Sequence, residues 1–215
     1  ENYKKNFDLL KKNNVYSEEM EHDACGVGLI SSTEGKKSRK VVEYGIEALK
    51  AVWHRGAVDA DGKTGDGAGI HVEIPKDFFI EKIEVTGHTY DSSEICVGMI
   101  FLPRNDYATQ ESCKTIVESE LTKNNFSIYG WRQVPVNPKV LGEKAFHTMP
   151  EIIQVLFKSN SSELLNKELE RKIYETRRKI ENKAFQISLN NFYICSFSSK
   201  SIIYKGMFLA EAISD

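Results

Sequence analysis

A cysteine at position 25 stands where a polar leader gives way to a compact, more apolar sequence. Gly26 and Gly28 follow it closely and leave space beside its side chain. If the chain were cut between Ala24 and Cys25, one residue would carry both a thiol and a free α-amine. An α-amine has an ordinary pKa of about 7.7–8.0, so it could serve as the base for its own side chain, as in N-terminal nucleophiles. The alternative is that Cys25 is a plain cysteine in a core strand.

A loop rich in Gly and Asp spans residues 56–69, and it does not fit the common phosphate and calcium motifs. Gly62-Lys63-Thr64 looks like the end of a P-loop, but the first glycine of that motif would fall on Ala57. The loop leads into a predicted strand at Ile70 rather than into a helix, which also excludes a dinucleotide fingerprint. In a calcium loop, Lys63 would occupy a ligand position. The glycines therefore indicate turns and a main chain that can approach a ligand closely.

Composition excludes several classes of function. The chain has 215 residues, with 29 Lys and Arg against 31 Asp and Glu, a balance that argues against a nucleic-acid partner. No stretch approaches the roughly 18 apolar residues needed to cross a membrane. The first 24 residues contain no apolar h-region, so a cytosolic location is the default expectation. Cys96, Cys113 and Cys195 form no C-x-x-C pair and lie in apolar runs, which predicts buried thiols and no metal site.

Hydrophobic periodicity predicts an α+β or layered α/β chain in which strands and helices alternate. The predicted strands cover residues 25–30, 70–74, 95–102, 126–133, 192–197 and 201–204. The predicted helices cover residues 39–54, a segment from about 106 with Cys113, Ile116, Val117 and Leu121 inward, residues 162–183, a short segment after Gly206, and weakly the surroundings of Phe7. Three prolines make residues 134–150 irregular. The long charged helix should place Leu165, Leu169 and Ile173 inward and pair Glu168 with Lys172 and Glu175 with Lys179.

An ordered set of motifs resembles the start of a class II glutamine amidotransferase domain, and more closely that of the large (alpha) subunit of glutamate synthase. The similarity runs from about Glu21 to the last residue, and an ordered set over this length is highly specific. The matching stretches are Cys25-Gly26-Val27-Gly28, His54-Arg55-Gly56-Ala57, Gly65-Asp66-Gly67-Ala68-Gly69-Ile70, Tyr129-Gly130-Trp131-Arg132-Gln133-Val134-Pro135 and Ser201-Ile202-Ile203-Tyr204-Lys205-Gly206-Met207.

The resemblance implies an N-terminal nucleophile hydrolase fold of α+β type, with two stacked sheets between helix layers (αββα), incomplete within these residues. It implies that residues 1–24 are a leader or propeptide removed by processing. Residues 25–215 would then be the N-terminal part of the amidotransferase domain. By resemblance, Cys25 attacks the side-chain amide of L-glutamine and forms a thioester, ammonia leaves, and water releases glutamate.

The resemblance also assigns residues to substrate binding. Arg55 matches an arginine in the glutamine pocket, and a guanidinium suits a substrate carboxylate because its fork donates two parallel hydrogen bonds. The alternative for Arg55 is a cation that offsets a helix C-terminus. Gly56 could present its main chain to the substrate. Asp66 could shape the loop or bond the substrate's ammonium, and His54 would be structural.

One departure from the family pattern concerns the oxyanion hole. The family forms it with an Asn-Gly pair farther along the chain, and these 215 residues contain no Asn-Gly dipeptide. We therefore expect this chain to be the front part of a longer polypeptide. The FMN, iron–sulfur cluster and NADPH implied for the full-length enzyme would lie beyond it, as would the 2-oxoglutarate site. The partners implied are the rest of the large subunit and a small (beta) subunit.

Two other hypotheses stay open at this stage. The amidotransferase domain could serve a different synthase, which only residues beyond 215 would reveal. The chain could also be a non-catalytic module in which Cys25 is an ordinary core thiol. The electron donor, whether a nicotinamide or ferredoxin, is not encoded in these residues, although the closer resemblance is to the NADPH-dependent type.

Overall fold

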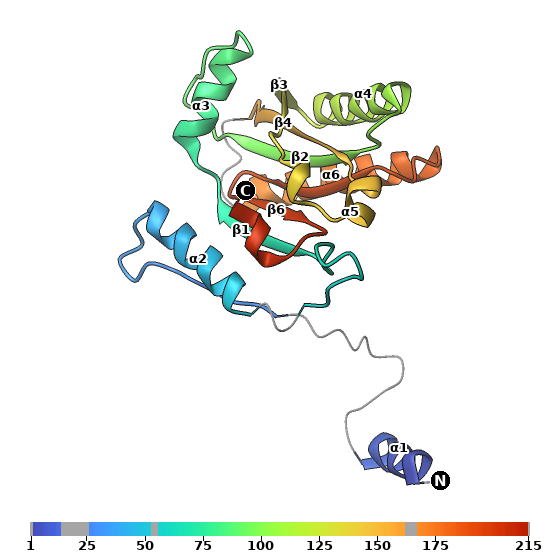
Figure 1. Ribbon diagram of the computed structural model, residues 1–215. Coiled ribbons are helices and arrows are strands. Elements are labelled where there is room, and N and C mark those ends of the chain that lie inside the picture. The colour runs from blue at the N-terminus through green and yellow to red at the C-terminus, as the bar shows by residue number, and fades with distance from the viewer. Residues whose placement is uncertain (1, 14–25, 53–55, 162–166, 215) are drawn as a thin grey trace.

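The strands that the structure describes form two antiparallel sheets, with helices packed around them (Figure 1). The computed structural model describes residues 2–13, 26–52, 56–161 and 167–214. The strands are β1 (Ala68–Glu73), β2 (Cys96–Leu102), β3 (Phe126–Gln133), β4 (Glu151–Ser159), β5 (Tyr193–Ser198) and β6 (Ser201–Gly206). The α-helices are α1 (Asn2–Asn13), α2 (Arg39–Ala51), α3 (Lys76–Val85), α4 (Tyr107–Lys123), α5 (Glu143–Thr148) and α6 (Lys167–Gln186), and the 3₁₀ turns are η2 (Pro138–Val140) and η3 (Ala210–Ser214). The α+β class is therefore confirmed.

The larger sheet has the strand order β3-β4-β2-β5, and its central strand β2 is buried on both faces. Successive side chains of a strand point to opposite faces, so β2 supplies two separate cores. Cys96, Ile100 and Leu102 enter the first core, which α4 and α6 cover. Val97 and Met99 enter the second core on the other face. A run that is apolar at every position is what a strand buried on both faces requires.

The second core lies between the larger sheet, α3 and the two-stranded sheet formed by β1 and β6. β1 pairs with β6 in antiparallel register, with Ala68 opposite Gly206 and Glu73 opposite Ser201. Helix α2 packs against β1 and η3, on the side of this small sheet away from α4 (Figure 1). Figure 1 also shows α1 apart from the other elements.

Two edge strands of the larger sheet each contain a bulge that turns a side chain into the second core. On β3, Ile128 and Gly130 pair with successive residues of β4, so Tyr129 is the extra residue. On β5, Ile194 and Ser196 pair with successive residues of β2, so Cys195 is the extra residue. Bulges re-aim side chains in this way, and both Tyr129 and Cys195 are buried among second-core residues.

Gly98 lies on the face of β2 that is turned toward the first core. Only a residue without a side chain fits there. A Cβ at this position would come within 2.4 Å of the Phe197 ring and 2.7 Å of a Val155 methyl group. The Phe197 ring stacks on Phe157 with a centroid separation of 4.8 Å. The glycine therefore makes room for a stacked aromatic pair in the core.

Several predicted elements are confirmed. The strand at 126–133 has the predicted bounds, and Asp106 caps α4 because its side chain accepts the N–H of Thr109. Leu169 and Ile173 are buried on α6, whereas Leu165 lies outside the described residues. Cys96, Cys113 and Cys195 are buried free thiols, as predicted.

Other predictions were wrong. No strand forms over residues 26–30, where Val27 is 91% and Leu29 is 88% exposed. Alternation alone does not make a strand, because the main chain also needs a hydrogen-bonded neighbour, and no described strand pairs with this segment. Residues 134–150 contain η2 and α5, and the last helix is a 3₁₀ turn. Glu175 pairs with Arg171 at 2.9 Å rather than with Lys179.

The structure describes α3 and β4 in segments for which periodicity gave no prediction. Among the described helices, none combines the length and the apolar character required to cross a lipid bilayer.

Candidate active site

The loop before β1 is a small antiparallel hairpin. Val58 forms an isolated bridge with Gly65, and the N–H of Asp59 donates to the carbonyl of Thr64 at 2.8 Å. Gly62 closes the tip with a positive φ of 71°, and its N–H donates to the carbonyl of Asp59 at 2.9 Å. Residues 56–66, here called the glycine loop, therefore have a defined shape rather than an open one.

Asp66 closes the base of the glycine loop. Its carboxylate Oδ2 accepts the main-chain N–H of Ala57 at 2.9 Å, and its own N–H donates to the Ala57 carbonyl at 3.3 Å. This pair of bonds fixes the main chain next to Gly56. Asp66 therefore has a contact within the loop, which is one of the two roles expected for it, while a bond from Asp66 to a substrate ammonium remains a prediction.

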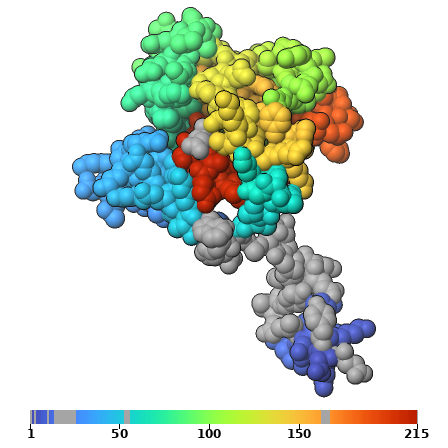
Figure 2. All heavy atoms as spheres, in the orientation of Figure 1, coloured from blue at the N-terminus to red at the C-terminus, as the bar shows by residue number. Residues whose placement is uncertain are grey.

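The glycine loop is also held against the C-terminal segment. Gly65 is buried, and a Cβ there would lie 2.9 Å from the carbonyl oxygen of Phe208. In Figure 2 the loop is the teal surface beside the red C-terminal segment. The glycine at this position thus permits direct contact between two main chains.

A groove of about 1250 Å³ begins at this loop. Asp66, Gly67 and Ala68 line one end, and apolar side chains such as Met99, Phe101 and Ile203 line much of the rest. Among the polar groups in its wall are Arg104 and His147. A concave and mainly apolar groove with a few polar groups is the usual form of a small-molecule site, so this end of β1 is the candidate active site.

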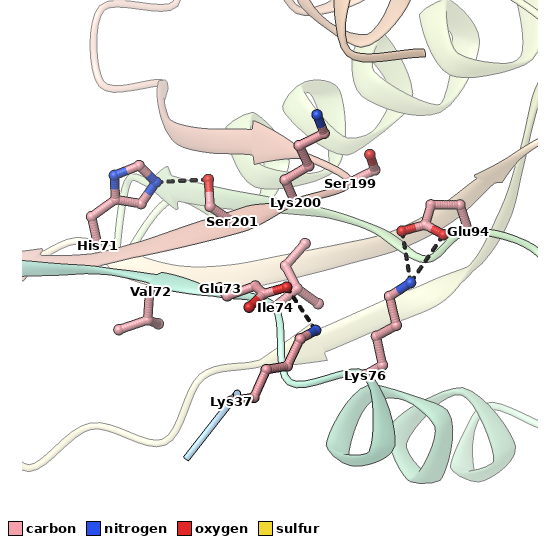
Figure 3. Close-up of a pocket in the computed structure, with 10 residues that line it drawn as sticks. All are labelled: Lys37, His71, Val72, Glu73, Ile74, Lys76, Glu94, Ser199, Lys200 and Ser201. Atoms are coloured by element: carbon pink, nitrogen blue, oxygen red, sulfur yellow. Dashed lines mark hydrogen bonds and ion pairs between the residues drawn. The ribbon is translucent and has the colours of Figure 1, made fainter. Parts of the chain in front are cut away.

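A second pocket, of about 520 Å³, lies at the other end of β1 (Figure 3). Two of its lysines form ion pairs within the pocket: Lys37 with Glu73 at 2.7 Å and Lys76 with Glu94 at 2.8 Å. His71 Nε2 lies 2.6 Å from Ser201 Oγ across β1 and β6. Figure 3 shows these contacts joining separate segments, so the pocket is best explained as a set of tethers rather than as a reaction site.

The sequence matches the profile of the class-II glutamine amidotransferases over residues 25–215. The chain belongs to this family. The match begins at Cys25, the residue singled out for its chemistry. Cys25 and Arg55 lie outside the described residues, and the structure places Gly56 and Asp66, the other two predicted site residues, at the base of the same loop.

Several glutamate synthases are similar to this amidotransferase chain. It is 52% identical over 212 residues to the glutamate synthase [NADPH] large chain of Azospirillum brasilense, covering 99% of this chain and 14% of that protein. It is 39% identical over 206 residues to a ferredoxin-dependent glutamate synthase of Pyropia yezoensis, covering 93% of this chain and 13% of that protein. It is 39% identical over 195 residues to ferredoxin-dependent glutamate synthase 1 of Arabidopsis thaliana, covering 90% of this chain and 12% of that protein.

The resemblance expected from the motifs is therefore confirmed. The amidotransferase chain spans about one seventh of the length of the Azospirillum brasilense protein, since it covers 14% of it.

The three described cysteines of this amidotransferase are unsuited to act as nucleophiles. Burial raises the pKa of Cys96 and Cys195, and it raises the pKa of Cys113 to about 11. The thiolate is the reactive form, so these three thiols are poor nucleophiles at neutral pH.

The described residues do not fit the iron–sulfur cluster implied by the resemblance. An iron–sulfur cluster is held by several converging thiolates, and within the described ranges no three His, Cys, Asp or Glu side chains gather into a metal-binding group.

Sequence reasoning missed two residues, Thr64 within the glycine loop and Gly142 beside it. Thr64 is buried and bonded to Asp61, and Gly142 packs against both of them. A signal for Thr64 exists in the sequence, because the side chain of an Asp such as Asp61 often accepts main-chain N–H groups two or three residues further along the chain. No sequence signal links Gly142 to this loop, because 78 positions separate it from Thr64.

Proposed function

We propose that this chain is the glutaminase part of a glutamate synthase, and that it hydrolyses L-glutamine to glutamate and ammonia through a thioester on Cys25. The observation that carries this proposal is that the family match begins at Cys25. The identity of 52% to a glutamate synthase large chain over nearly the whole sequence supports the choice of parent enzyme.

The proposed reaction begins when residues 1–24 are removed and Cys25 gains a free amine. The amine takes the thiol proton, and sulfur attacks the side-chain amide carbon of glutamine. The same proton passes to the leaving nitrogen, so ammonia departs and a thioester remains. A water molecule, deprotonated by the amine, then releases glutamate and restores the thiol.

The glycine loop would hold the substrate during this reaction. Arg55 would bind the α-carboxylate of glutamine with two parallel hydrogen bonds. Gly56 would present its main chain, and the bonds between Asp66 and Ala57 would keep that main chain in place. Rigid placement of this kind lowers the entropic cost of reaching the transition state.

The oxyanion donors would come from outside these 215 residues, since the sequence contains no Asn-Gly pair. Loss of one oxyanion donor typically lowers turnover by about 10²–10³, so full activity should require the intact protein. We further propose that the two sheets are the front part of a four-layer αββα domain. The packing of α2 on the small sheet and of α4 and α6 on the larger one supports this arrangement.

In the whole protein, ammonia would pass to a second site for the reductive conversion of 2-oxoglutarate to glutamate. FMN, an iron–sulfur cluster and NADPH would serve that second reaction, and a small subunit would be a partner. The higher identity to the NADPH-dependent relative favours the nicotinamide as electron donor. A cytoplasmic location remains a prediction.

A glutaminase assay on the intact protein tests this proposal. We expect release of one glutamate and one ammonia per glutamine, and we expect Cys25→Ala to abolish it. Cys113→Ala is the matched control and should keep the activity, because Cys113 lies on the buried face of α4 in the first core. Full glutaminase activity in Cys25→Ala would overturn the proposal.

A further inference from the structure

Helix α5 begins without a cap of its own. Its N-cap residue is Gly142, which has no side chain, and no cap hydrogen bond is formed there. The first N–H groups of a helix lack partners within it, and a Ser, Thr, Asp or Asn side chain usually accepts one at the second or third position. In α5 the third position is Ala145, and its N–H donates to Thr64 Oγ1 at 3.4 Å. A residue of the glycine loop therefore supplies the missing cap.

Thr64 is placed for this contact by Asp61. Thr64 is only 2% exposed, and its hydroxyl donates to Asp61 Oδ2 at 2.6 Å. Asp61 Oδ1 accepts the N–H groups of Thr64 at 2.7 Å and of Lys63 at 2.9 Å. These bonds, led by that from the Thr64 hydroxyl, hold the pKa of Asp61 well below its usual range. The hydroxyl thus both donates and accepts, which leaves it no freedom to rotate.

Gly142 makes the approach of the loop possible. A Cβ at this position would lie 2.3 Å from both Thr64 Oγ1 and Asp61 Oδ2. Lys144, two residues further on, adds a tether because its ammonium lies 2.6 Å from Asp59 Oδ2. Three residues of the glycine loop thus contact the first turn of α5.

These contacts connect to the proposed substrate residues through the hairpin. Thr64 and Gly65 pair with Asp59 and Val58 on the opposite arm, and that arm leads directly to Gly56. The opposite arm has no buried polar anchor in the part of the loop that the structure describes. The position of the arm that leads to Gly56 therefore depends on its pairing with the arm that contains Thr64, together with the ion pair between Asp59 and Lys144.

We infer that Thr64, seated against Gly142, is a positioning residue for glutamine binding: it joins the glycine loop to α5 and so helps to set the place of the main chain at Gly56. This inference rests on the proposed glutaminase function. It assigns no chemical step to Thr64, so its removal should weaken substrate binding more than it slows the reaction of bound substrate.

The test compares Thr64→Val with Thr64→Ser in the intact protein. Thr64→Val keeps the volume and removes the hydroxyl, and we expect KM for glutamine to rise about tenfold while kcat falls less than about threefold. Thr64→Ser keeps the hydroxyl and should restore KM. Thr176→Val is the matched control, because Thr176 is also fully buried and its hydroxyl donates to the Lys172 carbonyl at 2.8 Å, on α6. It should leave KM unchanged.

A second variant approaches the same contact from the other side. Gly142→Ala leaves the Thr64 hydroxyl in place but pushes the loop away from α5, so it should raise KM as Thr64→Val does. Gly45→Ala is its control, since a Cβ at Gly45 would meet only a methyl group of Ile70 at 3.5 Å. Amide hydrogen exchange of residues 56–66 and 142–148 should become faster in Thr64→Val and in Gly142→Ala. It should stay unchanged in the two controls, Thr176→Val and Gly45→Ala.

The outcomes separate the two proposals. A wild-type protein without glutaminase activity would overturn the proposed function and, with it, the role of Thr64 in binding glutamine. An active wild type overturns the inference alone if Thr64→Val keeps its KM, if Thr64→Ser is equally impaired, or if Thr176→Val causes the same rise. Unchanged hydrogen exchange in both loop variants would also overturn it.

Discussion

Asp66 and Ala57 are joined by two hydrogen bonds that run in opposite directions across the base of the glycine loop. One uses the Asp66 carboxylate, at 2.9 Å, and the other uses main-chain groups only, at 3.3 Å. The side-chain bond therefore supports a contact that the main chain already makes. It holds in place Ala57, the residue that follows Gly56 in the sequence.

Replacing Asp66 should separate its two possible roles. Asp66→Asn keeps an oxygen that can accept the Ala57 N–H, so we expect KM for glutamine within about threefold of wild type if the contribution is to the loop. Asp66→Ala removes the acceptor and should raise KM about tenfold. Steady-state kinetics of the two variants decide the matter. An Asn variant as impaired as the Ala variant would instead indicate that the negative charge binds the substrate ammonium.

The sequence was sufficient to predict the elements whose pattern is local. The helix α2, the start of α4 near Asp106 and the strand at Phe126–Gln133 are each encoded within a short window. The strand expected over residues 25–30 is not formed at the described residues 26–30, because pairing depends on a neighbouring strand that the local pattern does not report.

The candidate site could be predicted only in part. Asp66 and Gly56 were identified from the motifs, and the structure brings both to one loop base. The contact between Thr64 and Ala145 joins residues 81 positions apart, so no spacing rule could reveal it. Elsewhere in the fold, the local pattern also could not show that Tyr129 and Cys195 enter the second core, because their direction results from bulges set by partner strands.

If Arg55 binds the α-carboxylate of glutamine, its replacement should weaken the binding of substrates that carry this group. We expect Arg55→Ala to raise KM for glutamine about 10²-fold, since a hydrogen-bonded charged pair contributes about 1.5–3 kcal/mol. Arg55→Lys should recover only part of this loss, because an ammonium cannot form the two parallel bonds. The α-amide of glutamine, which lacks the carboxylate, is the control substrate. Its kinetics should change little between wild type and Arg55→Ala, and an equal loss for both substrates would contradict the assignment.

Alkylation should distinguish Cys25 from the other cysteines. We expect iodoacetamide at neutral pH to modify Cys25 in the processed, folded protein, because the adjacent amine assists its thiol. Cys96, Cys113 and Cys195 should react only after denaturation, since burial raises the pKa of each thiol. Peptide mapping by mass spectrometry measures all four sites. Rapid labelling of a second cysteine in the folded protein would contradict this prediction.

Acid should weaken the segment that joins α3 to β2. Asp91 accepts the Tyr129 hydroxyl at 3.0 Å and pairs with Lys158, and the bond from Lys158 leads in holding its pKa below the ordinary value of 3.8. A lowered pKa in the folded state contributes stability above pH 3.8, which is lost as the pH falls through the folded value.

Asp91→Asn should therefore lower the melting temperature at pH 7 and have progressively less effect below pH 3.8. Thermal melts of the two proteins across pH 2–7 measure this, at about unit spacing. Asp77→Asn is a suitable control because Asp77 lies exposed in the first turn of α3. A difference between wild type and Asp91→Asn that grows toward low pH would contradict the prediction.

The central claim is that Cys25 acts with its own amine, and the N-terminus of the active protein tests this most directly. N-terminal sequencing and intact-mass measurement of protein purified from its natural source should find Cys25 as the first residue, with residues 1–24 absent and the amine unmodified. Full glutaminase activity in protein that still carries the Ala24–Cys25 peptide bond would contradict the account.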